Sequence, residues 1–330
     1  MILDGRLDAS LHAAAQALAR GELVGLPTET VYGLAANADD DTAVARIFAA
    51  KGRPTDHPLI VHVAGADAAA HYARELPLFA QQLIDAFWPG PLTVIVARRA
   101  RAARAATGGQ DSVGLRAPAH PVAQALLAAC ARLEPPIHGL AAPSANRFGR
   151  VSPTTAQHVA EELGAALPVL DGGACAVGIE STIVDCTRGV PVLLRPGAIT
   201  RAQLEAACGQ RVLLKEELPA LAPRASGTLL AHYAPNAPVR LMDARQLQAA
   251  LDLLGQDAAH VVVYARTPLR AGRGVRLQAM PEVAADAARE LFATLRALDA
   301  SGARLIWIEH PPETPDWDGV RDRLQRAAAA

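Results

Sequence analysis

The segment 23–63 limits the possible folds of this chain more than any other part of the sequence. Its first apolar run, 23–26, ends at Pro27 and leads into the polar turn 28–30. A helical pattern then ends in a basic Lys-Gly-Arg sequence at 51–53, and a second apolar run, 59–63, follows. Short strands that alternate with a helix are typical of α/β proteins, which place their chemistry at the ends of such elements. The segment therefore predicts an α/β fold with a ligand site at these strand and helix ends.

The two cations of this segment, Lys51 and Arg53, are one residue apart beside a glycine and a proline. Such a pair suits a polyanion such as a triphosphate. An ordinary basic helix C-terminus, favoured by the helix dipole, also explains these three residues and is the commoner case. The pair alone leaves both interpretations open.

A resemblance to a known family changes that balance. It rests on blocks that occur in order along nearly the whole chain: PTETVYGL, KGRPTDHPL, SVGLRAP, APSANRFGRVSPT, GIESTIVD, LLRPG, HYAPNAPV and DRLQRAA. These blocks resemble the YrdC-type threonylcarbamoyl-AMP synthases. The resemblance implies a nucleotidyltransferase that makes threonylcarbamoyl-AMP and pyrophosphate from L-threonine, bicarbonate and ATP. The product would serve a separate transferase that modifies the adenosine beside the anticodon of tRNA.

Composition limits the cell compartment and the partners. The 330 residues are enough for two domains, and 51% hydrophobic with 20% charged residues indicates a packed core. The net charge of −1 provides no global attraction to nucleic acid, so an anion site must be local, and tight tRNA binding is not expected. The four cysteines lack the spacing of a zinc or redox pair, and neither a secretory signal nor a membrane-spanning apolar run is visible. A cytoplasmic protein is expected.

The hydrophobic pattern predicts a large domain, a linker and a smaller domain, and the resemblance implies that the large domain is the catalytic one. Residues 1–214 should form a twisted, open, mixed α/β sheet with helices, which the resemblance identifies as YrdC-like. Residues 215–237, rich in Pro, Ala and small polar residues, have the composition of a linker, and the resemblance implies that it acts as a lid. Residues 238–330 repeat strands and helices regularly, as a small Rossmann-like α/β domain does.

Arg116 is the clearest amino-acid-binding candidate. It closes the apolar strand of SVGLRAP, where a guanidinium is costly to bury without an anion, and its planar fork suits a carboxylate. The resemblance implies that this arginine holds the threonine carboxylate. For the rest of the threonine pocket the resemblance implies Thr30, His62, backbone near Ala142, and Ser181.

The ATP site follows from the same resemblance. The implied contacts are Lys51, Arg53, His57, Ser112, Ser144, Asn146, Ser152, Arg195 and Tyr233, with Lys51 and Arg53 as the catalytic cations. His57 departs from the family pattern, which usually has Asn there, and it is bulkier and can titrate. Tyr233 would be laid over the nucleotide by the linker. Mg²⁺ is expected to come with ATP, held mainly by the phosphates.

No pair of residues in the sequence resembles a nucleophile with its base, which suits a reaction driven by alignment and charge neutralisation. Two other functions fit the sequence less well. An RNA-binding module is disfavoured by the balanced charge and the 4% aromatic content. Carbamoyl transfer in hydrogenase maturation would require zinc-finger parts that the cysteine spacing does not support. The sequence leaves open the oligomeric state, the order of substrate binding, the group that deprotonates the threonine amine, the linker path, and what the second domain does besides anchoring the linker.

Overall fold

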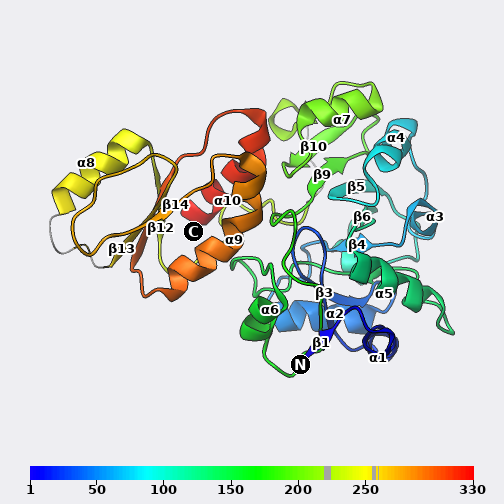
Figure 1. The fold of residues 1–330 in the computed structure, drawn as a ribbon. Helices are drawn as coiled ribbons and strands as arrows, with labels where there is room; N and C mark the ends of the chain where they lie inside the picture. The colour runs from blue at the N-terminus through cyan, green and yellow to red at the C-terminus, as the bar shows by residue number, and fades with distance from the viewer. Residues whose placement is uncertain (219–223, 255–257, 259) are drawn as a thin grey trace. The chain divides into compact units, whose positions relative to one another are not determined.

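The computed structural model describes the chain except residues 219–223, 255–257 and 259 (Figure 1). The chain divides into two compact units. The first contains residues 1–148 and 152–228, and the second contains residues 149–151 and 229–330. The linker predicted at 215–237 is shared between them, and its residues 219–223 lie outside the described part of the chain. The predicted boundaries at 214 and 237 stay a prediction.

The first unit is built on a mixed sheet of eleven strands in the order β1-β8-β2-β3-β7-β4-β6-β5-β9-β10-β11. In chain order these strands are β1 (Ile2–Asp4), β2 (Val24–Leu26), β3 (Gly33–Asn37), β4 (Ile60–His62), β5 (Leu92–Ala97), β6 (Ser112–Arg116), β7 (Leu140–Ala141), β8 (Val169–Asp171), β9 (Thr182–Asp185), β10 (Val192–Arg195) and β11 (Leu213–Leu214). Parallel pairs such as β4 with β6 occur beside antiparallel pairs such as β2 with β3. The predicted mixed sheet is confirmed.

Helices and short helical turns complete the first unit. They are α1 (Asp8–Ala19), α2 (Asp41–Lys51), α3 (Ala66–Ala69), α4 (Leu78–Phe87), η1 (Ala105–Thr107), α5 (Pro121–Ala131), α6 (Ala156–Leu163), α7 (Arg201–Cys208) and η2 (Lys215–Glu217). Helix α2 begins where the Asp40 side chain accepts hydrogen bonds from the backbone N–H groups of Thr42 and Ala43. It ends at Gly52, whose φ of 61° is the left-handed conformation that glycine adopts without strain.

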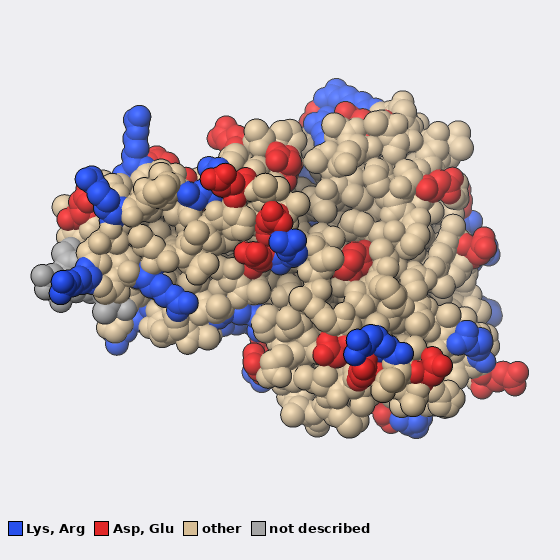
Figure 2. All heavy atoms as spheres, viewed as in Figure 1, with Lys and Arg blue, Asp and Glu red and all other residues tan. Residues whose placement is uncertain are grey.

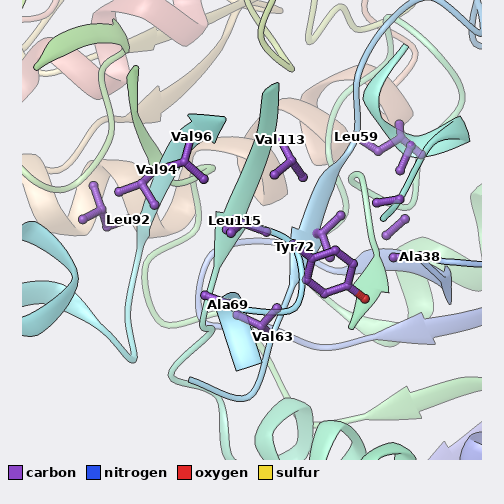
Figure 3. Close-up of a cluster of buried hydrophobic side chains, with 14 of the residues drawn as sticks. Ala38, Leu59, Val63, Ala69, Tyr72, Leu92, Val94, Val96, Val113 and Leu115 are labelled. Carbon is purple, nitrogen blue, oxygen red and sulfur yellow. The ribbon is translucent and has the colours of Figure 1, made fainter. Parts of the chain in front are cut away.

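Both faces of the sheet are buried, since successive residues of a strand belong to different hydrophobic clusters. Leu34 of β3 belongs to the cluster that contains Ile47 of α2 and Leu83 of α4, whereas the next residue, Ala35, belongs to the cluster that contains Leu18 of α1 and Leu126 of α5. Figure 3 shows part of the first cluster, in which the labelled side chains of β5 and β6 appear together with the ring of Tyr72. Burial on both faces explains why the strands read as continuous apolar runs.

The second unit contains a fully parallel four-stranded sheet in the order β12-β15-β13-β14. Its elements are β12 (Val239–Met242), α8 (Ala244–Leu254), β13 (Val261–Ala265), β14 (Arg276–Ala279), α9 (Ala284–Ala300), β15 (Leu305–Glu309), η3 (Pro315–Trp317) and α10 (Asp318–Ala328). This confirms a second, smaller α/β domain. Across the described residues, no helix is both long and apolar enough to cross a membrane.

Candidate functional site

The threonine-pocket candidates of β4 and β6 lie side by side because these two strands are parallel neighbours. The register pairs His62 directly with Arg116. The polar turn that follows β2 brings Thr30 to the same place, and Arg116 Nη1 donates a 2.7 Å hydrogen bond to Thr30 Oγ1. The structure therefore joins three residues that are far apart in the sequence into one buried group.

Arg116 is paired with an anion of the protein itself, Glu29. Its Nη2 donates to Glu29 Oε1 at 2.6 Å, and its Nε donates to the carbonyl oxygen of Gly90 at 3.2 Å. The second carboxylate oxygen of Glu29 accepts from the backbone N–H of Ala119 at 3.0 Å. Both side chains of the ion pair are buried. The sequence analysis expected an anion beside Arg116 but did not identify Glu29, although it lies next to Thr30 in the same motif.

The hydroxyls of Thr28 and Thr30 form a hydrogen-bond chain with a fixed direction. Thr28 Oγ1 donates its only hydrogen to the carbonyl oxygen of Val31 at 2.6 Å. In the 2.9 Å contact between the two hydroxyls, Thr30 must therefore be the donor. Since Thr30 also accepts from Arg116, its hydroxyl can offer a substrate only a lone pair.

His62 is a neutral imidazole in this site. Burial, and then the charge of Arg116, lowers the pKa of His62 from 6.5 to about 3. Its Nδ1 is buried, and no hydrogen-bond partner for it occurs within the described residues. A neutral ring with an unsatisfied nitrogen is suited to a polar ligand contact and is too weakly basic to accept a proton at neutral pH.

A second pair of hydroxyl side chains lies beside the start of β9. Ser181 Oγ is 2.8 Å from Thr93 Oγ1 of β5 and accepts from Arg195 Nη2 at 3.2 Å. Arg195 also donates to the carbonyl oxygen of Ser181 from both Nε and Nη2. The threonine-pocket candidate Ser181 and the ATP candidate Arg195 are therefore in direct contact. Ala142 is buried beyond the end of β7, packed close to Gly33.

Lys51 is fixed by the loop that carries the Ser-Ala-Asn unit. Its Nζ donates to the carbonyl oxygen of Ser144 at 2.5 Å and to that of Asn146. The side chain is 3% exposed, and burial together with the nearby charge of Arg53 holds the pKa of Lys51 well below its usual value. An anionic ligand would offset both effects.

Arg53 and Arg195 meet at Ser226, a residue of the predicted linker. Arg53 Nη2 contacts Ser226 Oγ at 3.4 Å, and Arg195 Nη1 donates to the Ser226 carbonyl oxygen at 2.9 Å. Arg53 also lies over the Phe148 ring, and His57 contacts that ring edge-on. Burial and Arg53 lower the pKa of His57. Two cations predicted to bind phosphate thus converge on one small polar residue.

The remaining candidates occupy three places. Ser152 is buried and donates a 2.5 Å hydrogen bond to Glu180, which directly precedes Ser181. Ser112 begins β6 and lines a small cavity together with Gly114 and Ser226. Tyr233 belongs to the second unit, where its ring packs on Phe292 and lies under the guanidinium of Arg323.

The site also contains polar residues that the sequence analysis did not assign: Glu29, Thr93, Glu180 and Ser226. Glu29 and Glu180 could have been noticed, because each is an acid inside an otherwise buried motif that carries a predicted contact. Thr93 is part of an ordinary apolar strand, and only the pairing of β5 with β9 brings it to Ser181. The residues around Thr93 in the sequence therefore give no indication that it belongs to the site.

Comparisons with known proteins cover nearly the whole chain. The family model Sua5_yciO_yrdC, described as telomere recombination, matches residues 16–197. A model described as the C-terminal domain of threonylcarbamoyl-AMP synthase matches residues 199–329. The threonylcarbamoyl-AMP synthase of Pyrococcus abyssi is 38% identical, over 96% of this chain and 94% of the relative. The protein of the same name from Bacillus subtilis is 36% identical, over 97% of this chain and 93% of the relative.

Solved structures agree with these relatives. The crystal structure of Pyrococcus abyssi Sua5 complexed with L-threonine matches with a TM-score of 0.89 and 35% identity, covering 99% of this chain and 97% of that one. A variant of the same protein, with a neighbouring histidine and tyrosine replaced by alanine, matches with a TM-score of 0.88 and 34% identity, covering 99% of this chain and 96% of that one. The chain belongs to the threonylcarbamoyl-AMP synthase family, in its two-domain form.

Proposed function

We propose that this chain makes threonylcarbamoyl-AMP and pyrophosphate from L-threonine, bicarbonate and ATP. Family membership supports the overall reaction, and threonine and ATP are the substrates that it implies. The observation that carries the proposal is the group of buried cations at strand and helix ends, above all Lys51, whose charge is desolvated beside Arg53. Buried cations need an anionic partner to offset the loss of hydration, so this group suits a polyanion.

The threonine half of the site is assigned to the group around Arg116. We propose that Arg116 binds the substrate carboxylate, Thr30 accepts a hydrogen bond from the substrate hydroxyl, and Ser181 supplies a second polar contact. The unsatisfied Nδ1 of His62 and the small side chain of Ala142 would line the same pocket. This assignment uses the residues that the first-unit fold brings together.

The ATP half is assigned to Lys51, Arg53 and Arg195, with Ser112, Ser144, Asn146, Ser152 and His57 around them. The nucleotide contact that the resemblance implies for Tyr233, a residue of the second unit, stays a prediction. In the proposed reaction, the threonine nitrogen first takes up the carbon of bicarbonate, giving a carbamate and water. A carbamate oxygen then attacks the α-phosphorus of ATP, and the bond to pyrophosphate breaks. The cations stabilise the charge that builds on the phosphate oxygens, which is the main demand of phosphoryl chemistry.

Mg²⁺ is proposed to enter with ATP. In the described part of the chain, no group of three His, Cys, Asp or Glu side chains is placed to hold a metal. The nucleotide-side residues are cations, hydroxyls and amides, a donor set that fits a metal ligated by phosphate oxygens and water. Mg²⁺ bound in this way would neutralise phosphate charge, while Lys51, Arg53 and Arg195 orient the triphosphate.

The product would pass to a separate tRNA-modifying transferase, and the cytoplasmic location expected from the sequence stays a prediction. Direct RNA binding by this chain is the weaker alternative. On the face drawn in Figure 2, Lys and Arg side chains are interspersed with Asp and Glu and form no continuous basic stripe.

Pyrophosphate release tests the proposal. The purified full-length chain should release pyrophosphate only when threonine, bicarbonate, ATP and Mg²⁺ are all present, and each omission should abolish it. Lys51→Met, which keeps the length of the side chain but not its charge, should raise the KM for ATP and lower kcat. Pyrophosphate release without threonine or without bicarbonate would reject the proposed reaction.

A further inference from the structure

The fork of Arg116 is only partly used by the protein. A guanidinium has five N–H groups, and three of them donate to Gly90, Thr30 and Glu29. Since the last two bonds use one N–H from each terminal nitrogen, one N–H on each is not used by a hydrogen bond to any described residue. Two N–H groups on two neighbouring nitrogens match the two oxygens of a carboxylate.

The Glu29 carboxylate fixes the orientation of that fork. It is 8% exposed and is held at its other oxygen by the backbone N–H of Ala119, which follows the strand end that carries Arg116. Glu29 therefore connects the turn after β2 to the segment after β6. Without it, the guanidinium would keep Gly90 and Thr30 as partners but lose its strongest, charged hydrogen bond.

The negative charge of Glu29 also repels the substrate carboxylate, so Glu29 must have a role other than attracting the substrate. A second carboxylate beside Arg116 partly cancels the positive charge that a substrate carboxylate would meet. A site selected for attraction alone would leave the arginine unpaired. The pairing with Glu29 fixes the orientation of the guanidinium, so less conformational entropy is lost when the substrate binds. This gain in binding free energy must exceed the electrostatic attraction that Glu29 removes.

We propose that Glu29 is a positioning residue for the amino-acid substrate: it holds Arg116 so that one N–H of each terminal nitrogen faces the substrate carboxylate. This inference rests on the proposed function, in which Arg116 binds the carboxylate of threonine. It assigns Glu29 no contact with the reacting atoms and no part in proton transfer.

The test compares substrate-like ligands with and without a carboxylate. L-Threoninol has a CH₂OH group in place of the carboxylate of threonine and keeps the amine and the hydroxyl. Its inhibition constant against threonine is measured from pyrophosphate release by the full-length enzyme. Glu29→Ala should raise the KM for threonine by about tenfold to a hundredfold. The KM for ATP and the inhibition constant of threoninol should stay within about twofold of the wild-type values, because neither ligand uses the Arg116 fork.

Glu29→Ala removes one partner of a buried ion pair and can therefore destabilise the fold. Glu29→Gln is a second variant that tests the same role with less risk of unfolding. The amide keeps the shape and can still accept from Arg116, so the threonine KM should rise by only a few fold. Glu309→Gln is the matched control. Glu309 is a buried carboxylate of the second unit that accepts from the backbone N–H groups of Arg266 and Thr267. This variant should lower thermal stability without changing the threonine KM.

Two results would overturn the positioning role. An equal loss of threonine and threoninol affinity in Glu29→Ala would mean that Glu29 shapes the whole pocket. A fall in kcat with an unchanged threonine KM in Glu29→Gln would mean that Glu29 takes part in the chemical step. Failure of the wild-type enzyme to release pyrophosphate would instead reject the proposed function, and the two failures are therefore separate.

Discussion

At the residue scale, the hydrogen-bond direction at Thr30 decides what the amino-acid pocket can recognise. Thr30 gives its hydrogen to Thr28 and accepts from Arg116, so it can only accept from the substrate. Threonine and serine carry a hydroxyl that can donate to it, whereas valine does not. A site built for a hydroxyl discriminates against its loss far more strongly than against a missing methyl.

We therefore expect valine to be rejected more strongly than serine. In pyrophosphate release, kcat/KM for valine should be lower than that for threonine by at least about a hundredfold, and the value for serine should lie between them. Thr30→Val, which is nearly isosteric but has no acceptor, should reduce the preference of threonine over valine. Equal kcat/KM values for threonine and valine in the wild-type enzyme would contradict this pocket assignment.

His62 gives the fold a predictable pH dependence. The folded-state pKa is about 3, below the ordinary 6.5, so between these values the unfolded chain binds a proton that the folded chain does not. Its contribution to stability is therefore complete above pH 6.5 and is lost as the pH falls towards 3. Between pH 7 and pH 5 this amounts to about 2 kcal/mol of the free energy of unfolding.

Urea unfolding at pH 7 and pH 5 measures this loss, and His62→Gln isolates it. Glutamine does not titrate, so the variant should lose about 2 kcal/mol less than the wild type over the same interval. An identical pH dependence in both proteins would show that His62 is not kept neutral by the fold.

Many residues of the candidate site could be predicted from the sequence, but the hydrogen bonds between them could not. Thr30, His62 and Arg116 stand in recognisable motifs at strand ends, and the structure brings them together as expected for one site. The partner of Arg116 could not be predicted because Glu29 is 87 residues away and becomes its neighbour only when the sheet forms. Sequence motifs identify the groups of a site, whereas their hydrogen-bond partners depend on strand order.

At the element scale, helix α2 places the two cations through its C-terminus. Gly52 sits between Lys51 and Arg53 with a φ of 61°, and a Cβ atom there would meet open space. An L-residue at this position is disfavoured by backbone conformation and not by crowding. Gly52→Ala should therefore cost about 1 kcal/mol of stability and also disturb the two cations.

A second helix end offers a matched control. Gly209 ends α7 with a φ of 65° and also faces open space, but it carries no predicted contact. Gly52→Ala and Gly209→Ala should lower the midpoint of thermal unfolding by similar amounts, while only Gly52→Ala raises the KM for ATP. A raised ATP KM in both variants would mean that general loosening of the fold, and not cation placement, causes the effect.

Two strands show no clear strand pattern in the sequence, each for a physical reason. Strand β3 has the sequence GLAAN, without β-branched or aromatic residues, and is a strand because β2 and β7 pair with its two edges. Strand β14 is mostly exposed at the edge of the second sheet, so it shows no apolar pattern. Helix α7 is different, because its capping box of Thr200 and Gln203 is a readable signal in the sequence.

At the scale of the whole molecule, the chain is not divided at one point. The short segment 149–151 belongs to the second unit, where the N–H of Ala234 donates to the carbonyl oxygen of Gly149 and Arg296 donates to that of Val151. Composition could indicate a linker near residue 215 but could not show this contact with residues about 80 positions earlier. The chain therefore passes from one unit to the other three times, after residues 148, 151 and 228.

Truncations should separate folding from synthesis. A chain ending after Gln210 lacks β11 and Ser226, and a chain ending after Thr228 keeps both. Both should fold, as judged by circular dichroism and a cooperative thermal transition, because the strands from β1 to β10 and their core are retained. Both should synthesise poorly, with the longer one retaining tighter ATP binding. Wild-type pyrophosphate release by either truncation would show that the second unit serves something other than catalysis.

Tyr233 should account for much of what the second unit contributes. It is buried, it has a positive φ of 62° although it is not a glycine, and it is held by Phe292 and by Arg323, whose side chain is fully buried. A non-glycine residue persists in this conformation only where its surroundings fix it, which often marks a functional position.

Tyr233→Ala should therefore reduce pyrophosphate release and the yield of intermediate in the full-length chain while leaving it folded. Tyr233→Phe keeps the ring and its packing and should retain most of the activity if packing is what matters. Wild-type rates and yields in Tyr233→Ala would remove Tyr233 from the nucleotide site.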